Sequence, residues 1–187
     1  MARDLLAAAL MAAFRLSRAN VLVLAVMLAG IGLAVFRPHE LFLYNPSESL
    51  PKGFYIRQDG AMALGTIVTI RSIDAAPEYA SRRNFTDAGD RFLKRIAAVE
   101  GDTVCAEGST IRINDVIVAE RAEADPAGDP LPSWSGCVAL GGGDVFLLGD
   151  DPGSFDGRYW GISKRADLTG PWQPVRGSGD RTSSLHG

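Results

Sequence analysis

Residues 91–104 read RFLKRIAAVEGDTV, and this stretch indicates how the chain folds. In an extended strand, successive side chains point to opposite faces of the sheet. A strand over residues 92–98 therefore places Phe92, Lys94 and Ile96 on one face. Lys94 then has apolar neighbours on its own face, and such surroundings disfavour the charged form of a lysine. The stretch predicts a strand that carries a partly desolvated amine.

Four further segments outside this stretch have the composition of strands bounded by turns. They are residues 53–58, 65–72, 110–120 and 141–153. The third reads as a hairpin that turns at Asn114 and Asp115. Residues 75–90 predict a surface loop with one helical turn after Pro77, and the Pro- and Asp-rich residues 122–135 predict an irregular excursion. The fold class is therefore mainly β.

A second feature is the uncharged, mostly apolar run at residues 19–36. Its length lies at the short end for a transmembrane helix and at the long end for a signal-peptide core. Arg3, Arg15 and Arg18 precede it, and positively charged flanks stay in the cytoplasm. We expect residues 1–18, with a helix over residues 5–16, to be cytoplasmic and the run to be an uncleaved signal-anchor.

Two alternatives to the anchor remain open. The run could be a signal peptide cleaved near Gly32-Leu33-Ala34, or a buried core helix. With an anchor or a cleaved signal, residues 37–172 form an exported domain. Residues 173–187 are almost all polar or Gly/Pro and predict a disordered tail.

The net charge and the cysteine content argue against a nucleic-acid-binding protein and against a zinc protein. The net charge of −3 leaves no basic surface for phosphates, so we expect no nucleic-acid partner. Cys105 and Cys137 are the only cysteines, so their pairing is unambiguous if they form a disulfide outside the cytoplasm. Two buried free thiols are the alternative. Two cysteines without nearby histidines are too few for a zinc site, and we expect no metal or cofactor.

The basic side chains restrict the chemistry that the chain could perform. A Ser-His-Asp triad needs an imidazole in the folded domain, but His39 adjoins the apolar run and His186 lies beside the C-terminus. A lysine can serve as a base when its amine is neutral. Of the three lysines, Lys52 and Lys164 lie in turn-like polar segments and read as surface charges. Lys94 is the candidate base, and burial would have to lower its pKa by about 2–3.

Four sequence boxes occur in order along the chain. They are NPSESLPKGFY at 45–55, LGTIVTI at 64–70, KRIAAVEGD at 94–102 and GDDPGSFDGRYWG at 149–161. Together they resemble the conserved boxes of the signal peptidase I superfamily. The proline two residues after Ser49, followed by Gly-Phe-Tyr, resembles the TraF-type conjugal transfer peptidases in particular. The resemblance implies a signal-peptidase-like β core behind an N-terminal transmembrane helix, with a disulfide-bearing irregular excursion over 105–137.

The same resemblance implies roles for individual residues. Ser49 would be the nucleophile and Lys94 its base, a Ser-Lys dyad. The Ser49 backbone N–H and the Ser47 hydroxyl would form the oxyanion hole. Ser154 would orient the Lys94 amine.

Asp156 and Arg158 would hold the walls of the site as a charge pair. The chain departs from the family pattern at four positions: Thr66 replaces an acid, Leu50 a Met, Asp151 an Asn and Gly157 a Ser. Because Gly157 lacks this hydroxyl, the resemblance implies that the Lys94 amine has less support here than in signal peptidase I.

The resemblance further implies a membrane-anchored serine endopeptidase of the bacterial inner membrane, with its catalytic domain in the periplasm. It would process an exported precursor, most specifically the pilin of a conjugative type IV secretion system, and could contact other conjugation machinery. A general signal peptidase I, a self-cleaving repressor-type protease and an inactive membrane-tethered pilus assembly factor are the alternatives.

Overall fold

The computed structural model describes residues 18–35 and 41–175 of the chain. The predicted helix before residue 17, His39, His186 and most of the predicted tail lie outside these residues. The chain divides into two compact units, Met1–Leu41 and Phe42–Gly187. The first contains helix α2, Arg18–Val35, over the predicted apolar run. Among the residues the structure describes, no helix is long and apolar enough to cross a membrane.

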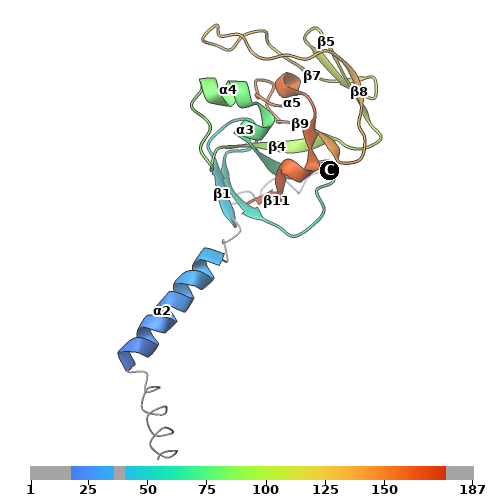
Figure 1. Cartoon of the computed structure of the whole chain (residues 1–187). Helices are drawn as coiled ribbons and strands as arrows, with labels where there is room; N and C mark the ends of the chain where they lie inside the picture. Colours follow the sequence, from blue (N-terminus) through green and yellow to red (C-terminus); the bar gives the residue numbers. More distant parts are fainter. Residues whose placement is uncertain (1–17, 36–40, 176–187) are drawn as a thin grey trace, which may run out of the picture. The chain divides into compact units, whose positions relative to one another are not determined.

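The second unit is built on a seven-stranded antiparallel sheet (Figure 1). Its strands are, in spatial order, β1 (Phe42–Asn45), β2 (Gly53–Arg57), β11 (Leu168–Pro174), β3 (Ile67–Arg71), β4 (Arg91–Ala98), β9 (Asp144–Leu148) and β10 (Ser163–Lys164). The last strand, β11, thus inserts between β2 and β3 and is separated from the first strand, β1, by β2 alone. Mainly β structure was the prediction, and the structure confirms it.

Strand β4 has the two-faced character that its sequence predicts. Ile96 and Phe92 pack in one hydrophobic cluster with Val68 of β3. Leu93, on the opposite face, packs in a separate cluster with Leu50. The strand is therefore covered on both sides, which explains why a lysine in its middle is buried.

A smaller antiparallel sheet of four strands follows β4 in the chain. Its order is β7 (Val116–Glu120), β6 (Thr110–Ile113), β5 (Thr103–Glu107) and β8 (Gly136–Ala139). The turn between β6 and β7 has left-handed backbone at Asn114 and Asp115, with φ of 49° and 68°, so the predicted hairpin is confirmed.

This sheet corrects the prediction of an irregular excursion over residues 105–137. Cys105 of β5 and Cys137 of β8 are directly opposed in the ladder and form the expected disulfide, with an S–S distance of 2.05 Å. Only the middle of the segment, after β7, follows the predicted irregular course. The alternative of two free thiols is therefore wrong.

Short helices complete the domain. They are α3 (Ser72–Ala75), α4 (Pro77–Arg82), α5 (Gly157–Trp160) and the 3-10 turn η1 (Arg165–Asp167). Helix α4 begins at the proline that predicted it, since proline fits the first turn of a helix. The predicted start of the tail is too early. Gln173 and Pro174 belong to β11 and pair with Ile56 and Tyr55 of β2.

Candidate active site

The turn between β1 and β2 carries both predicted oxyanion-hole and nucleophile serines, and a buried asparagine shapes it. Asn45 ends β1 opposite Gly53 and is only 4% exposed. Its Nδ2 donates to the carbonyl of Leu50 at 2.9 Å, and its Oδ1 accepts from the Ser47 N–H at 3.2 Å. Asparagine commonly organises a turn through such side chain–backbone hydrogen bonds. The asparagine thus fixes the loop on either side of Ser49.

The two serine hydroxyls of this turn contact each other. Ser47 Oγ lies 2.8 Å from Ser49 Oγ and 2.8 Å from Asn45 Oδ1. An amide oxygen can only accept, so Ser47 gives its single proton to Asn45. Ser49 must then donate to Ser47. In this arrangement Ser47 does not donate a hydrogen bond to the Ser49 oxygen, whose lone pairs therefore stay available.

Lys94 lies opposite Val68 in the β3–β4 ladder and is only 3% exposed. Its Nζ donates to Ser154 Oγ at 2.9 Å and lies 5.9 Å from the centre of the Phe92 ring. Burial lowers the pKa of Lys94 from 10.5 to about 8, with Asp156 acting to raise it and Arg158 to lower it. A substantial fraction of the amine is therefore neutral near neutral pH, as a general base requires.

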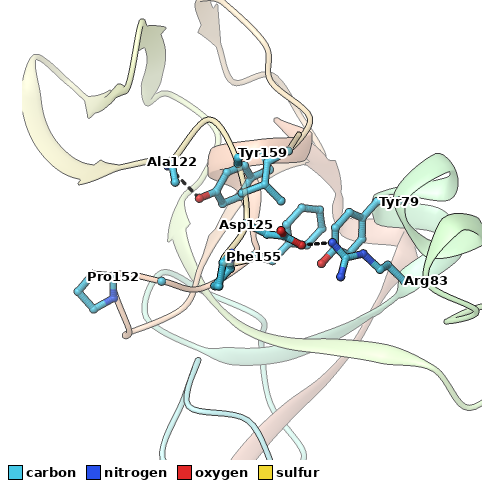
Figure 2. Close-up of a pocket in the computed structure, with 11 residues that line it drawn as sticks. Tyr79, Arg83, Ala122, Asp125, Pro152, Phe155 and Tyr159 are labelled. Carbon is cyan, nitrogen blue, oxygen red and sulfur yellow. Dashed lines mark hydrogen bonds and ion pairs between the residues drawn. The ribbon is translucent and has the colours of Figure 1, made fainter. Parts of the chain in front are cut away.

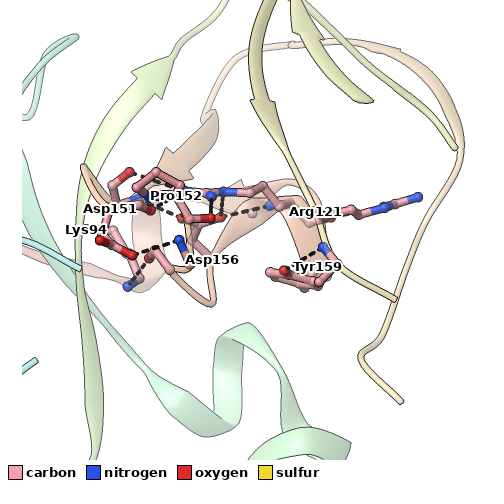
Figure 3. A network of polar contacts seen from close by, with 12 residues as sticks. Lys94, Arg121, Asp151, Pro152, Asp156 and Tyr159 are labelled. Carbon is pink, nitrogen blue, oxygen red and sulfur yellow. Dashed lines mark hydrogen bonds and ion pairs between the residues drawn. The ribbon is translucent and has the colours of Figure 1, made fainter. Parts of the chain in front are cut away.

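Asp156, which Figure 3 labels, forms the predicted charge pair with Arg158. Arg158 Nε donates to Asp156 Oδ1 at 2.9 Å, and both side chains are almost completely buried. Asp156 also accepts from the backbone N–H of Gly149 at 2.7 Å, and Arg158 donates to the Asp151 carbonyl at 2.9 Å. A buried pair is tolerable only when its remaining polar atoms are also satisfied. Here those extra bonds go to the backbone of residues 149–152, which the pair holds in shape.

Gly149 brings the nucleophile turn and the lysine together. The Asp150 N–H donates to the Ser49 carbonyl at 2.7 Å. A Cβ at Gly149 would lie 2.8 Å from that carbonyl oxygen and would overlap the Ser154 hydroxyl. The backbone at 149 is therefore in contact with Ser49 on one side and with the partner of Lys94 on the other. Only glycine permits this approach.

A partly exposed ion pair with two parallel hydrogen bonds supports the contact between residue 150 and the Ser49 carbonyl. Arg95 donates to the two carboxylate oxygens of Asp150 at 2.9 and 2.8 Å. Its third contact is with the Gly65 carbonyl at 2.9 Å. Because Asp150 holds the Ser49 carbonyl, the ion pair fixes that backbone relative to β4.

The ring of Phe155 anchors the loop between the two buried polar residues Ser154 and Asp156. It stacks on Tyr79 of α4 with ring centres 3.7 Å apart and on Tyr159 of α5 at 5.2 Å. These rings border a cavity of about 550 Å³ that is closed on one side by the ion pair of Arg83 with Asp125 (Figure 2).

Gly157 has a packing explanation in the structure. A Cβ at this position would lie 2.6 Å from the Leu147 carbonyl oxygen and 2.7 Å from the Phe146 ring. A serine side chain therefore has no room in this backbone. The Lys94 amine donates to Ser154, and less support than in signal peptidase I stays a prediction.

The other two lysines lie on the surface, as predicted. Lys52 pairs with Glu48 at 3.0 Å, and both side chains are exposed. Lys164 pairs with Asp144 and is also exposed. Within the described ranges, no three His, Cys, Asp or Glu side chains lie close enough together to hold a metal ion.

Sequence reasoning placed every serine and the lysine of this site but missed Asn45 and Gly149. Asn45 precedes a proline, and Asn-Pro favours turn initiation, so a signal for its role was present. The Gly-Asp pair that opens the last box was also visible. Its meaning depends on a contact 100 residues away along the chain, with Ser49.

Comparison with known proteins supports the assignment that these features suggest. The family model of the signal peptidases, peptidase S26, matches residues 14–175. Two plasmid transfer proteins TraF of Escherichia coli are each 30% identical to the chain, over 149 and 142 residues, and both alignments cover 70% of this chain and 80% of the TraF protein. A crystal structure of a signal peptidase I from Enterococcus faecalis is 23% identical, with a TM-score of 0.36 over 61% of this chain and 98% of that one.

That superposition is too loose to support an argument, so the assignment rests on the sequence matches. The family model spans all the described residues and contains all four boxes. The chain belongs to the signal peptidase family, peptidase S26.

Proposed function

We propose that the chain is a Ser-Lys endopeptidase that cleaves an exported precursor, with Ser49 as nucleophile and Lys94 as base. The observation that carries this proposal is the buried Lys94 amine, with its lowered pKa, beside Ser154. An unperturbed lysine would be almost fully charged at neutral pH and could not accept a proton. Gly149 supports the pairing with Ser49, because it contacts both Ser154 and the Ser49 backbone.

The catalytic cycle follows from these groups. The Ser49 O–H turns from Ser47 toward Lys94, and Ser49 Oγ attacks the scissile carbonyl carbon while its proton passes to the neutral Lys94 amine. The C–N bond then breaks, and the ammonium returns that proton to the leaving amine. An acyl ester on Ser49 remains. A water molecule gives a proton to Lys94 as it attacks this ester, and the proton returns to Ser49 Oγ when the acid leaves.

The negative oxygen of the tetrahedral intermediate would be stabilised by the Ser49 N–H and the Ser47 hydroxyl. In the resting arrangement the Ser47 proton points to Asn45 Oδ1. Ser47 would therefore have to rotate its O–H toward the oxyanion, which a hydroxyl does readily. One such donor typically contributes about 10²–10³ in rate.

The substrate and location are argued from the relatives and from the N-terminal sequence. Two relatives are plasmid transfer proteins, which favours a precursor that serves conjugative transfer, and a pilin is the exported subunit we propose. Arg3, Arg15 and Arg18 before the apolar run favour an anchor in the bacterial inner membrane with the peptidase domain in the periplasm.

The dyad is tested by variants of its members. Ser49→Ala and Lys94→Ala should each abolish cleavage of the co-expressed pilin precursor, followed by mass spectrometry of the product. Lys52→Ala and Lys164→Ala are the matched controls, because these two lysines are surface ion-pair partners, and both should process normally. Near-normal turnover by Lys94→Ala would contradict the dyad.

General preprotein processing is a second candidate, because the matching family model is that of the signal peptidases. Expression of this chain in a strain depleted of its own signal peptidase distinguishes the two candidate functions. Rescue of growth by this chain would favour the general enzyme, whereas pilin processing without rescue would favour the specialised one.

A further inference from the structure

A second concave surface lies beside the active-site loop, on the edge of the small sheet. This groove has a volume of about 580 Å³. One wall is the end of β7 with the residues that follow it, 118–122, and the other is the loop at 148–150 with Pro152 and Arg158. None of the steps proposed above uses β7, so the groove needs its own explanation.

Strand β7 is an unusual edge. It pairs with β6 alone, so its other side presents unpaired backbone groups among the strands that the structure describes. Val116, Ile117 and Val118 are 64%, 58% and 41% exposed. Exposed β-branched edges invite pairing with another extended chain, and proteins usually blunt them with lysine or proline. The sequence of β7, VIVAE, has neither.

The groove shares two lining residues with the loop that supports the candidate active site. Gly149 and Asp150 line it, and the same two residues contact the Ser49 carbonyl. A peptide held at the free edge of β7 could therefore reach Ser49 without leaving the protein surface. Five residues of extended peptide span about 17 Å, the length of β7 itself.

The chemistry of the dyad indicates which part of the substrate lies there. Lys94 must protonate the leaving amine, so the chain on the C-terminal side of the scissile bond departs on the side of Lys94. Ser154 binds Lys94, and the loop that leads to Ser154 forms a wall of the groove.

We propose that this groove binds the substrate segment C-terminal to the cleaved bond, as an added strand on β7 with aliphatic side chains against Val118. The proposal rests on the proposed peptidase function. Addition of a strand to a sheet edge gives affinity through backbone hydrogen bonds and selectivity through alternate side chains.

Two quenched fluorescent peptides test the proposal with the full chain in detergent. Both have Ala-Val-Ala before the scissile bond; the short one has Ala-Ala after it, and the long one has Ala-Ala-Val-Thr-Val-Thr-Val. We expect kcat/KM of the wild type to be about tenfold higher for the long peptide, since a few net-favourable backbone hydrogen bonds suffice for such a factor.

Val118→Asp should reduce this long-to-short ratio to near one, because it places a charge in the groove. Val138→Asp is the matched control: Val138 is 38% exposed on β8, at the opposite edge of the same sheet, and its variant should keep the wild-type ratio. A wild-type ratio near one, or an equal loss in both variants, would overturn the groove proposal.

A binding measurement separates this proposal from the peptidase function. Labelled Ala-Ala-Val-Thr-Val-Thr-Val should bind the Ser49→Ala chain by fluorescence anisotropy, and Val118→Asp in that background should weaken binding about tenfold. If the wild type cleaves neither peptide, the peptidase proposal fails and this binding result alone decides the groove. Binding that is absent or insensitive to Val118→Asp would refute it.

Discussion

Three influences set the charge of Lys94, and they act in different directions. Burial is the largest and lowers its pKa, the Asp156 carboxylate raises it, and the Arg158 guanidinium lowers it. Because Asp156 and Arg158 neutralise each other in a close pair, their effects on the amine largely offset. The basicity of Lys94 therefore depends mainly on how completely water is excluded from β4.

The pH dependence of cleavage follows from this lowered pKa. The base is active when neutral, so kcat/KM should rise with pH and level off above a pKa of about 8. Stopped assays between pH 6 and 10 with a soluble peptide would measure the profile. Ser154→Ala should lower the plateau and move the midpoint, because it removes the acceptor of the Nζ hydrogen bond. A flat profile over this range would leave no role for a titrating amine.

At this scale the sequence indicated Lys94 directly, because the other two lysines lie in turn-like polar segments. Ser49 and Ser154 were indicated only by the resemblance of their boxes to those of the signal peptidases. Asn45 was not, because its function is to bond the backbone of its own turn. That function becomes visible only when the turn conformation is known.

Among the elements, the loop from β9 to α5 connects the parts of the site, and Gly149 is its most constrained position. Gly149→Ala should lower kcat by at least about 10², because the added methyl group would displace both Ser154 and the Ser49 carbonyl. Gly89→Ala is the matched control, since a Cβ there meets nothing within 4 Å. A peptide assay together with thermal unfolding would separate displacement of the site from loss of folded protein. Wild-type kcat in Gly149→Ala would contradict this arrangement.

The small sheet depends on its disulfide. Cys105 and Cys137 are separated by 32 residues, and closure of a loop of this length stabilises a protein by about 3–4 kcal/mol in the chain-entropy estimate. The Cys105→Ala/Cys137→Ala protein should lose a free energy of unfolding of that order in urea titration. Alkylation of the native wild type should label no cysteine unless a reductant is present. An unchanged midpoint in the double variant would show that the ladder of β5 and β8 suffices alone.

The elements with strong local signals were predictable, and those that depend on distant pairing were not. The Asn114-Asp115 turn and the alternating faces of β4 came from local sequence. Strand β8 did not, because its residues are exposed and show no inside–outside alternation. Its partner β5 lies more than 30 residues earlier, and the pairing of their cysteines was the one signal that joined them.

For the whole molecule, the N-terminal segment decides where the peptidase domain works. A reporter that is active only outside the cytoplasm, fused after Gly187, should be active, and a cytoplasm-dependent reporter should be silent. The reason is that, in the proposed topology, Arg3, Arg15 and Arg18 retain the N-terminus inside while the apolar run is inserted. Replacement of these three arginines by glutamate should reduce the external signal. The opposite reporter pattern would contradict the proposed topology.

The overall sheet order shows the limit of prediction from one sequence. The C-terminal residues 173 and 174 were polar or proline and resembled a tail, yet they complete β11 between the second and third strands. Their neighbours in the sheet are more than 100 residues away, so no local pattern could reveal the pairing.

The burial of Lys94 also lowers the free energy of unfolding of the protein. Its pKa falls from 10.5 to about 8 on folding, and at about 1.4 kcal/mol per tenfold change in proton affinity the folded state is about 3 kcal/mol less stable at neutral pH than it would be without this penalty. The penalty is complete below pH 8 and disappears as the pH approaches 10.5, where the unfolded chain also loses its proton. Lys94→Met replaces the amine with an apolar side chain of similar size. This inactive variant should therefore unfold at a higher temperature than the wild type in a thermal melt. In the proposed mechanism this loss of stability accompanies the supply of a neutral base to Ser49.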